Sequence, residues 1–252
     1  MNLTNHPLLV LASSCVILWL GAEVGNALRG GIRPIKEEER DDFGLVVSAT
    51  LTLLGLLIGF TFSMAITRYD QRKNYEEAEA NAIGTEYARA DLLPSECATA
   101  VRELLKEYAD ERILFYESRD PTGLEEIDRH TTDLQHRMWA AVESVSSSMP
   151  TPVIALAVSG MNDVLNSQGY TQAAWLNRIP TAAWWLMAVV AFSSNLLIGY
   201  RVRLRDWRIF LILPVMVSVA FFLIADIDSP RRGHIRVVPQ NLELLSESMH
   251  SR

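Results

Sequence analysis

The most informative stretch of this chain is Leu45-Val-Val-Ser-Ala-Thr-Leu-Thr-Leu-Leu-Gly-Leu-Leu-Ile-Gly-Phe-Thr-Phe-Ser-Met-Ala-Ile-Thr-Arg-Tyr-Asp70. It begins as a membrane-length apolar helix, and no Pro or turn signal separates it from a charged helical segment that ends near Leu93. A helix from Phe43 to Leu93 would be about 75 Å long, whereas the hydrocarbon layer of a bilayer is about 30 Å thick. Because such a helix projects well beyond the membrane, it needs partners along its length, which favours an oligomeric assembly.

Three further segments are also apolar and long enough to cross a bilayer. The four predicted membrane helices span residues 7–28, 43–66, 179–200 and 207–227. Short connectors at 29–42 and 201–208 join them into two antiparallel hairpins. We therefore expect an all-α, polytopic membrane protein with a transmembrane hairpin at 1–66, a helical extramembrane domain at 67–178, a second hairpin at 179–227 and a C-terminal tail at 228–252.

The extramembrane segment 67–178 carries most of the negative charge. It contains 11 Lys and Arg against 19 Asp and Glu, so its net charge is −8, close to the −7 of the whole chain. Its apolar residues recur at helical spacing, and the pattern predicts helices after Pro94, over Leu124–Ser148 and over Val153–Gln168. An acidic surface argues against nucleic acid as a partner.

Motifs for chemistry are sparse. The sequence has no nucleophile elbow, Walker loop, dinucleotide Gly loop or His-Glu-x-x-His. His130, Asp133 and His136 form the nearest approach to a metal cluster, but the two His are six residues apart, not the four of a helical zinc pair, and a solvated helix face is favoured. Cys15 and Cys97 provide no disulfide framework. We expect no enzyme, no metal and no cofactor.

The second membrane helix carries a stripe of small or weakly polar residues. At 100° per residue, the stripe falls within roughly 80° of the helix circumference. It could line a water-filled path, or it could allow close packing against another helix. Its members are Ser48, Thr52, Gly55, Gly59 and Ser63.

The same helix resembles the pore helix of bestrophins, in which Gly-Phe precedes Thr/Ser-Arg-aromatic by the same interval as Gly59-Phe60 precedes Thr67-Arg68-Tyr69. The chain as a whole resembles the bacterial bestrophin-like membrane proteins, a domain family of unknown function. Segments typical of that family are Leu56-Leu-Ile-Gly-Phe-Thr-Phe-Ser-Met-Ala65, Glu79-Ala-Asn-Ala-Ile-Gly84, Arg89-Ala-Asp-Leu-Leu-Pro94 and Asp226-Ile-Asp-Ser-Pro-Arg-Arg-Gly233.

The resemblance implies a pentameric, mostly anion-conducting channel with a hydrophobic neck on one face of the second helix. Carried over by position, the neck comprises Phe60, Leu56 and Thr52. Leu56 and Phe60 suit a constriction that gates by dewetting, whereas Thr52 departs from the apolar pattern. The acidic run of the animal calcium clasp has no counterpart here, so we expect no calcium gating.

Several charged or polar residues are candidates for a pore mouth or an interface. Glu23, near the end of the first helix, could be a vestibule charge, although snorkelling to the interface is favoured. Asp226 and Asp228 could line a mouth, although a structural ion-pair cluster is favoured. Arg68, Tyr69 and Arg72, where the second helix leaves the membrane, could form an anion-attracting ring or simple interfacial anchors.

We therefore expect a multi-pass protein of the bacterial inner membrane that forms a homo-oligomer, has the lipid bilayer as its partner and conducts chloride or other small ions. The rival interpretation is a non-conducting scaffold or sensor whose helical domain binds a partner. Basic loops at 29–42 and 201–208 would place both termini outside, since short basic loops prefer the cytoplasm. The bestrophin resemblance implies cytosolic termini, and we adopt that orientation.

Overall fold

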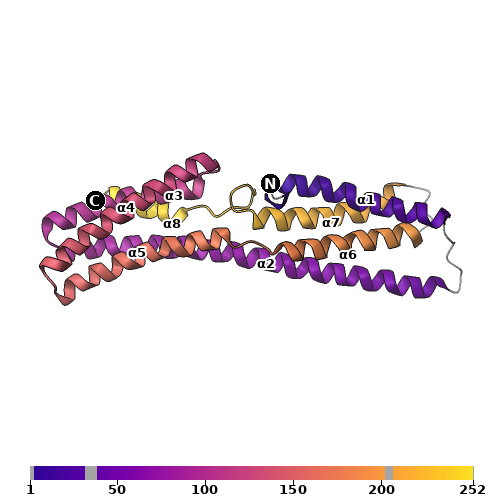
Figure 1. Cartoon of the computed structure of the whole chain (residues 1–252), viewed down its shortest axis with the longest axis horizontal. Helices are drawn as coiled ribbons and strands as arrows, with labels where there is room; N and C mark the ends of the chain where they lie inside the picture. The colour runs from indigo at the N-terminus through magenta and orange to yellow at the C-terminus, as the bar shows by residue number, and fades with distance from the viewer. Residues whose placement is uncertain (1–2, 32–38, 202–206, 252) are drawn as a thin grey trace. The chain divides into compact units, whose positions relative to one another are not determined.

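The computed structural model describes residues 3–31, 39–201 and 207–251, and nearly all of these residues are helical. Within these ranges there is no β-strand, as Figure 1 shows. The all-α fold expected from the sequence is confirmed. The connectors predicted at 29–42 and 201–208 fall largely outside the described residues.

Four helical stretches are long and apolar enough to cross a membrane, which agrees with the predicted polytopic arrangement. The third of them contains two helices, α5 (Pro152–Leu176) and α6 (Thr181–Arg201), and the sequence prediction places the membrane segment in α6. The four stretches are Pro7–Arg29, Asp41–Leu92, Pro152–Arg201 and Leu211–Asp228.

Two compact units divide the chain. The apolar unit comprises Met1–Arg68 and Arg178–Arg236, and the polar unit comprises Tyr69–Asn177 and Val237–Arg252. The apolar unit contains α1 (Pro7–Gly31), the first part of α2 (Arg40–Arg89), α6 (Thr181–Arg201) and α7 (Trp207–Asp228). The polar unit contains the rest of α2, α3 (Ser95–Glu117), α4 (Pro121–Ser148), α5 (Pro152–Leu176) and α8 (Gln240–His250).

Helix α2 is one uninterrupted helix of 50 residues. Asp41 and Asp42 lie in its first turn, where negative charge is favoured by the helix dipole. A short 3₁₀ turn, Ala90–Leu92, follows its last residue, and Leu93 is then extended with φ −90° and ψ 159°. Pro94 disfavours helical geometry at Leu93, so the long helix ends there.

Small residues bring α1 and α6 together in the apolar unit. A Cβ atom built on Gly25 would clash with the carbonyl oxygen of Leu196, and one built on Gly199 would clash with that of Ala22. Only glycine permits this close approach of two backbones. Around the crossing, Leu18, Ala22, Met187 and Ala191 are buried.

The polar unit is a helical bundle with capped helix starts and an aromatic core. The Asp120 carboxylate accepts a hydrogen bond from the Gly123 N–H at 3.0 Å, and the Thr151 hydroxyl accepts one from the Ile154 N–H at 3.2 Å. These side chains satisfy backbone donors at the starts of α4 and α5. Phe115, Tyr116 and Trp175 pack together with ring centroids 5.1–5.5 Å apart.

Two features of the polar unit differ from the helix limits expected from the sequence. Helix α5 continues through Gly169 to Leu176, because the buried face beyond Gly169 goes on with Thr171, Ala174 and Trp175. Residues after Asp228 include the helix α8, which packs on α3 with Leu242 and Met249 buried.

Candidate functional site

The residues proposed for the neck lie on one uncovered face of α2. Leu56 is 54% exposed and Phe60 is 65% exposed, although both are large and apolar. Thr52 is exposed one turn earlier, and its hydroxyl donates to the Ser48 carbonyl at 2.9 Å. That bond satisfies the hydroxyl donor within the helix, so Thr52 is less polar toward its surroundings than its type suggests. Since exposed apolar faces of this kind require lipid or protein cover, the face is available to a neighbour.

The small residues of the same helix are not packed against another described helix at the two glycines. A Cβ built on Gly55 or Gly59 would meet nothing within 4 Å. Ser48 and Ser63 are exposed as well, and only 17% of the apolar window of α2 is buried. Close packing within the chain at Gly55 and Gly59 therefore does not explain the stripe, and contact with lipid, packing against another chain or a water path would each account for it.

The candidate residues at the point where α2 is predicted to leave the membrane differ in burial. Arg72 is 1% exposed, and Tyr69 is partly buried against the core of the polar unit. Arg68 is half-buried, and its Nε and Nη1 atoms have no hydrogen-bond partner in the described part of the chain. Burial of Arg72 favours a structural role for it, and the Arg68 atoms without a hydrogen-bond partner are themselves buried.

The acidic candidates at the end of α7 hold backbone in place. Asp226 is 1% exposed and accepts from the backbone N–H groups of His234 and Ile235, each at 2.9 Å. Its carboxylate also contacts His234 Nδ1 at 2.9 Å. Asp228 accepts from Arg178 Nε at 3.3 Å and from the Ile179 N–H at 3.2 Å. Both carboxylates therefore fix the segments that enter α6 and leave α7.

Glu23 lies at the close crossing of α1 and α6. It is half-buried, and it stands between Ala22 and Gly25, which contact the backbone of α6. Its burial is intermediate, which neither assigns it to a vestibule nor leaves it fully exposed.

The family model for the Bestrophin-like domain matches residues 20–242, which is most of the chain. The chain belongs to the bestrophin-like family. This match covers the neck candidates, the exit of α2 and the acidic residues after α7, so the family predicted from the sequence is confirmed, and with it a membrane protein.

Solved structures share the fold of this bestrophin-like protein at low sequence identity. A bacterial Bestrophin homolog from Klebsiella pneumoniae superposes with a TM-score of 0.64 at 12% identity, covering 95% of this chain and 97% of that chain. A crystal structure described as a membrane protein variant gives a TM-score of 0.65 at 11% identity, covering 96% of this chain and 97% of that one. A search of curated proteins found no significant match. At these identities the structural likeness shows the fold alone.

His130 of the bestrophin-like protein lies against acidic residues of α3. Its Nδ1 atom is 2.8 Å from a Glu111 carboxylate oxygen, and its Nε2 atom is 3.4 Å from Glu107. The hydrogen bond to Glu111 raises the pKa of His130 above its usual value. The imidazole is thus part of a surface ion-pair cluster, and among the described residues no group of His, Cys, Asp and Glu could hold a metal ion.

A buried ionic network in the polar unit was not identified from the sequence. Glu79 and Arg112 are fully buried and form an ion pair, with Arg112 Nε 2.5 Å from Glu79 Oε1. The hydroxyls of Tyr116 and Thr171 donate to Glu79 Oε2 at 3.2 and 3.0 Å. Helical spacing places these residues on inward faces, but their pairing depends on how three different helices meet.

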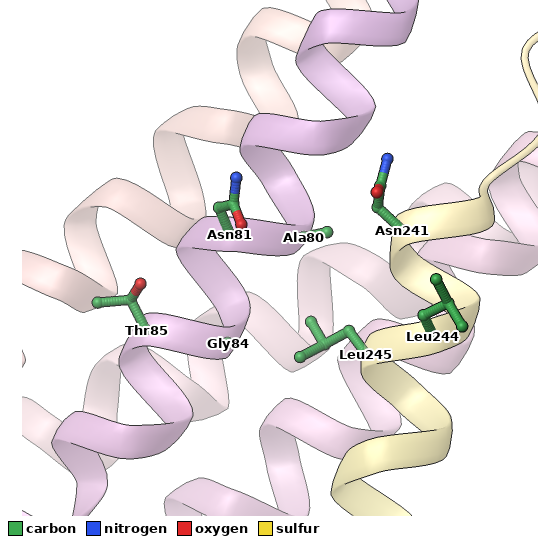
Figure 2. Close-up of a pocket in the computed structure, with 7 residues that line it drawn as sticks. All are labelled: Ala80, Asn81, Gly84, Thr85, Asn241, Leu244 and Leu245. Atoms are coloured by element: carbon green, nitrogen blue, oxygen red, sulfur yellow. The ribbon is translucent and has the colours of Figure 1, made fainter.

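A shallow groove separates α8 from α2 in the polar unit. Figure 2 shows Leu245 of α8 reaching toward Gly84 of α2, with Asn81 and Thr85 on the same stretch of α2. A Cβ on Gly84 would lie 3.0 Å from Leu245 Cδ1, so glycine allows the leucine to pack there. The groove has a volume of about 320 Å³ and is open to solvent.

Proposed function

We propose that this bestrophin-like protein assembles as a homopentamer in the bacterial inner membrane, as a multi-pass protein, and conducts chloride and other small anions along α2. In this assembly α2 of each subunit faces a central axis, and Leu56 and Phe60 form two successive apolar rings. The proposed function is transport without a chemical step. It therefore requires no catalytic residue.

The observation that carries the proposal is the uncovered face of α2. Leu56 and Phe60 are more than half exposed, and Gly55 and Gly59 beside them have no neighbour within 4 Å. A monomer would leave this face to lipid, but a ring of subunits would close it around an axis. Apolar rings in a narrow path gate by dewetting, which suits Leu and Phe at a constriction.

Thr52 extends the same face toward the start of α2. Because its hydroxyl donates to the Ser48 carbonyl, its methyl group and its remaining acceptor capacity are what it offers to a permeant ion. We propose Thr52 as a weakly polar entrance ring and Leu56 with Phe60 as the barrier. Arg68 would then attract anions where α2 leaves the bilayer.

Two measurements on the purified protein test the proposal. The native mass of the detergent complex should correspond to five subunits, since a monomer or dimer cannot enclose a path with α2. Planar-bilayer recordings under a salt gradient should show unitary currents with anion preference. A folded monomer or dimer would overturn the channel proposal and favour a scaffold or sensor.

A matched pair of variants locates the barrier. The double variant Leu56→Ala with Phe60→Ala should raise conductance or weaken gating. The smaller side chains widen both apolar rings, so that water no longer leaves them as easily. The control is Leu20→Ala on α1, since Leu20 is 46% exposed and is not a neck candidate. Equal currents from the double variant and the control would remove α2 as the barrier.

The orientation can be tested separately. A reporter fused after Arg252 should be active only in the cytosol if the termini and polar unit lie there. Activity of the same fusion on the periplasmic side would reverse the orientation without affecting the assignment of the barrier.

A further inference from the structure

A cleft of about 370 Å³ opens in the apolar unit between the first half of α1, the first half of α6 and the end of α7. Pockets that hold organic ligands are typically about 300–1,000 Å³, mostly apolar, with a few polar groups that orient the ligand. The cleft lies well away in sequence from the neck candidates of α2, and none of them lines it.

The closest approach of α1 and α6 that the glycines show lies toward the last halves of the two helices, whereas the cleft is lined by their first halves. Glycines at 25 and 199 bring the two backbones together, whereas Trp184, near the start of α6, lines the cleft. The Trp184 ring packs edge to face on Phe221 of α7, with centroids 6.3 Å apart at 85°. Trp184 therefore packs α6 on α7 beside the cleft.

The walls of the cleft are effectively apolar. Ile17, Leu18 and Ala188 supply aliphatic surface. The two wall serines direct their hydroxyls into their own helix, since Ser13 donates to the Leu9 carbonyl and Ser14 to the Val10 carbonyl, both at 2.6 Å. A hydroxyl bonded in this way needs no partner from a ligand, so a hydrocarbon chain can lie against it.

One end of the cleft is polar and holds an arginine whose charge is paired with Asp228. The Arg178 side chain is 28% exposed there, and it donates from Nη2 to Asn5 Oδ1 at 2.7 Å and from Nε to Asp228 at 3.3 Å. Asp228 is almost wholly covered, with 3% of its side chain exposed, and it also accepts from the Ile179 N–H. The guanidinium is thereby held in one orientation with part of its surface open.

This polar end coincides with the ends of three membrane helices. Helix α1 begins at Pro7, α6 begins at Thr181 and α7 ends at Asp228. If the three helices cross the bilayer as predicted, their ends place Arg178 at the level of lipid headgroups and Trp184 and Trp185 about one turn deeper, where indole rings are favoured. Trp185 is 69% exposed, as expected for a ring that faces lipid.

We infer that this cleft binds one acyl chain of a membrane phospholipid, whose phosphate contacts Arg178. The apolar walls would contact the acyl chain, and the exposed part of the guanidinium would bind the phosphodiester. The walls and the guanidinium lie at the depths at which a phospholipid has its acyl chain and its phosphate. The site does not depend on the proposed pore, and it would stabilise the bundle of α1, α6 and α7 whether or not the protein conducts.

Native mass spectrometry of the full-length protein, delipidated and then titrated with dioleoylphosphatidylglycerol, tests this inference. Wild type should retain one lipid per subunit. Ala188→Phe fills the cleft and leaves Arg178 with Asp228 intact, so it should weaken retention at least tenfold. Ala182→Phe is the matched control, because Ala182 is exposed on the same helix outside the cleft and should bind as wild type does.

Two further probes separate headgroup from chain. Oleic acid supplies the chain without a phosphodiester, and inorganic phosphate supplies the anion without a chain; both should bind at least tenfold more weakly than the phospholipid. Equal retention of the phospholipid by wild type and Ala188→Phe would overturn the inference that it binds in this cleft. So would oleic acid binding as tightly as the phospholipid, or a folded oligomer that excludes lipid because a neighbouring subunit fills the cleft.

Discussion

The Glu76 carboxylate on α2 holds Asn241 at the start of α8 through two hydrogen bonds, one from the Asn241 N–H at 2.9 Å and one from its Nδ2 atom at 2.6 Å. The next backbone N–H, of Leu242, donates to the same carboxylate at 3.0 Å. The residue before α8 is Pro239, which provides no side-chain cap. Glu76 thus supplies from another helix the acceptor that a capping residue normally supplies locally.

Glu76→Ala should therefore release α8. Loss of a helix cap costs about 1 kcal/mol, and loss of a carboxylate from the positive end of the helix dipole adds to that cost. Hydrogen exchange should rise in residues 240–250, with little change in α4. Glu77→Ala is the control, since Glu77 is the exposed neighbour of Glu76, and equal exchange in the two variants would contradict the capping role.

The buried pair of Glu79 and Arg112 should make the polar unit sensitive to a change in either partner. Arg112→Met leaves the Glu79 carboxylate without its cation in a fully buried position, a loss of about 3–5 kcal/mol. We expect a clear fall in the unfolding temperature of the detergent-solubilised protein. Adding Glu79→Gln should recover part of the loss, because the uncompensated charge is then removed.

The control for the buried pair is Arg137→Met at the surface. Arg137 lies 3.7 Å from both Glu107 and Asp133, and about half of its side chain is exposed. Surface pairs contribute about 0–1 kcal/mol, so this variant should unfold close to the wild-type temperature. An equal fall in unfolding temperature for both variants would show that the buried ion pair contributes no more to stability than the surface pair.

Gly199 should tolerate no side chain. Gly199→Ala places a Cβ against the backbone of Ala22, which cannot move aside as a flexible side-chain end would. We expect lower thermal stability and poorer yield of folded protein. Gly169→Ala is the opposite control: nothing lies within 4 Å of the added Cβ, and an alanine in a helix interior is favoured over glycine by about 1 kcal/mol.

His130 should make stability depend on pH. The hydrogen bond to Glu111 raises the pKa of His130 in the folded protein above its unfolded value, with Glu107 and Asp133 acting in the same direction. The stabilisation of the folded protein by protonated His130 is therefore complete below the pKa of the unfolded state, about 6.5. It is lost as pH rises through the pKa of the folded state. His130→Gln should lower the unfolding temperature more at pH 5.5 than at pH 8.5.

His136→Gln provides the comparison for His130, because His136 is exposed on the same helix. Its unfolding temperature should follow that of wild type at both pH values. A pH-independent difference between His130→Gln and wild type would show that packing, and not charge, accounts for the effect of His130.

Arg68→Gln should reduce anion preference if Arg68 faces the ion path in the assembled protein. The reversal potential under a salt gradient would then move toward zero, since each subunit loses one positive charge at the exit of α2. The matched control is Arg129→Gln in the polar unit, where the charge is exposed on α4. An unchanged reversal potential in Arg68→Gln would assign Arg68 to structure alone.

Local sequence accounts for the helices of this protein and for the length of α2. Apolar runs of membrane length predict spans because backbone groups in lipid must be satisfied within the helix. The stretch through Asp70 has no residue that ends a helix, and Pro94 ends the extension that follows. The end of α5 was the exception: the helix was predicted to stop at Gln168, but the buried face that continues to Trp175 outweighs the modest local cost of Gly169.

The neck candidates came from the resemblance of α2 to the bestrophin pore helix, and their spacing of four residues puts them on one side of the helix without tertiary information. Whether Leu56 and Phe60 are covered within the subunit depends on which sides of α2 the other membrane helices occupy. That information is long-range, and the fold supplies it by leaving the face uncovered.

The sequence by itself therefore determined the all-helical membrane class, the family and the single long helix, because each depends on hydrophobic length, periodicity or local motifs. The tertiary structure alone decided that Glu76 caps α8, that Glu79 pairs with Arg112, and that α1, α6 and α7 line a cleft with Arg178 at one end. These contacts join residues far apart in the chain. Their free energy depends on burial and on the meeting of several helices, which no local pattern encodes.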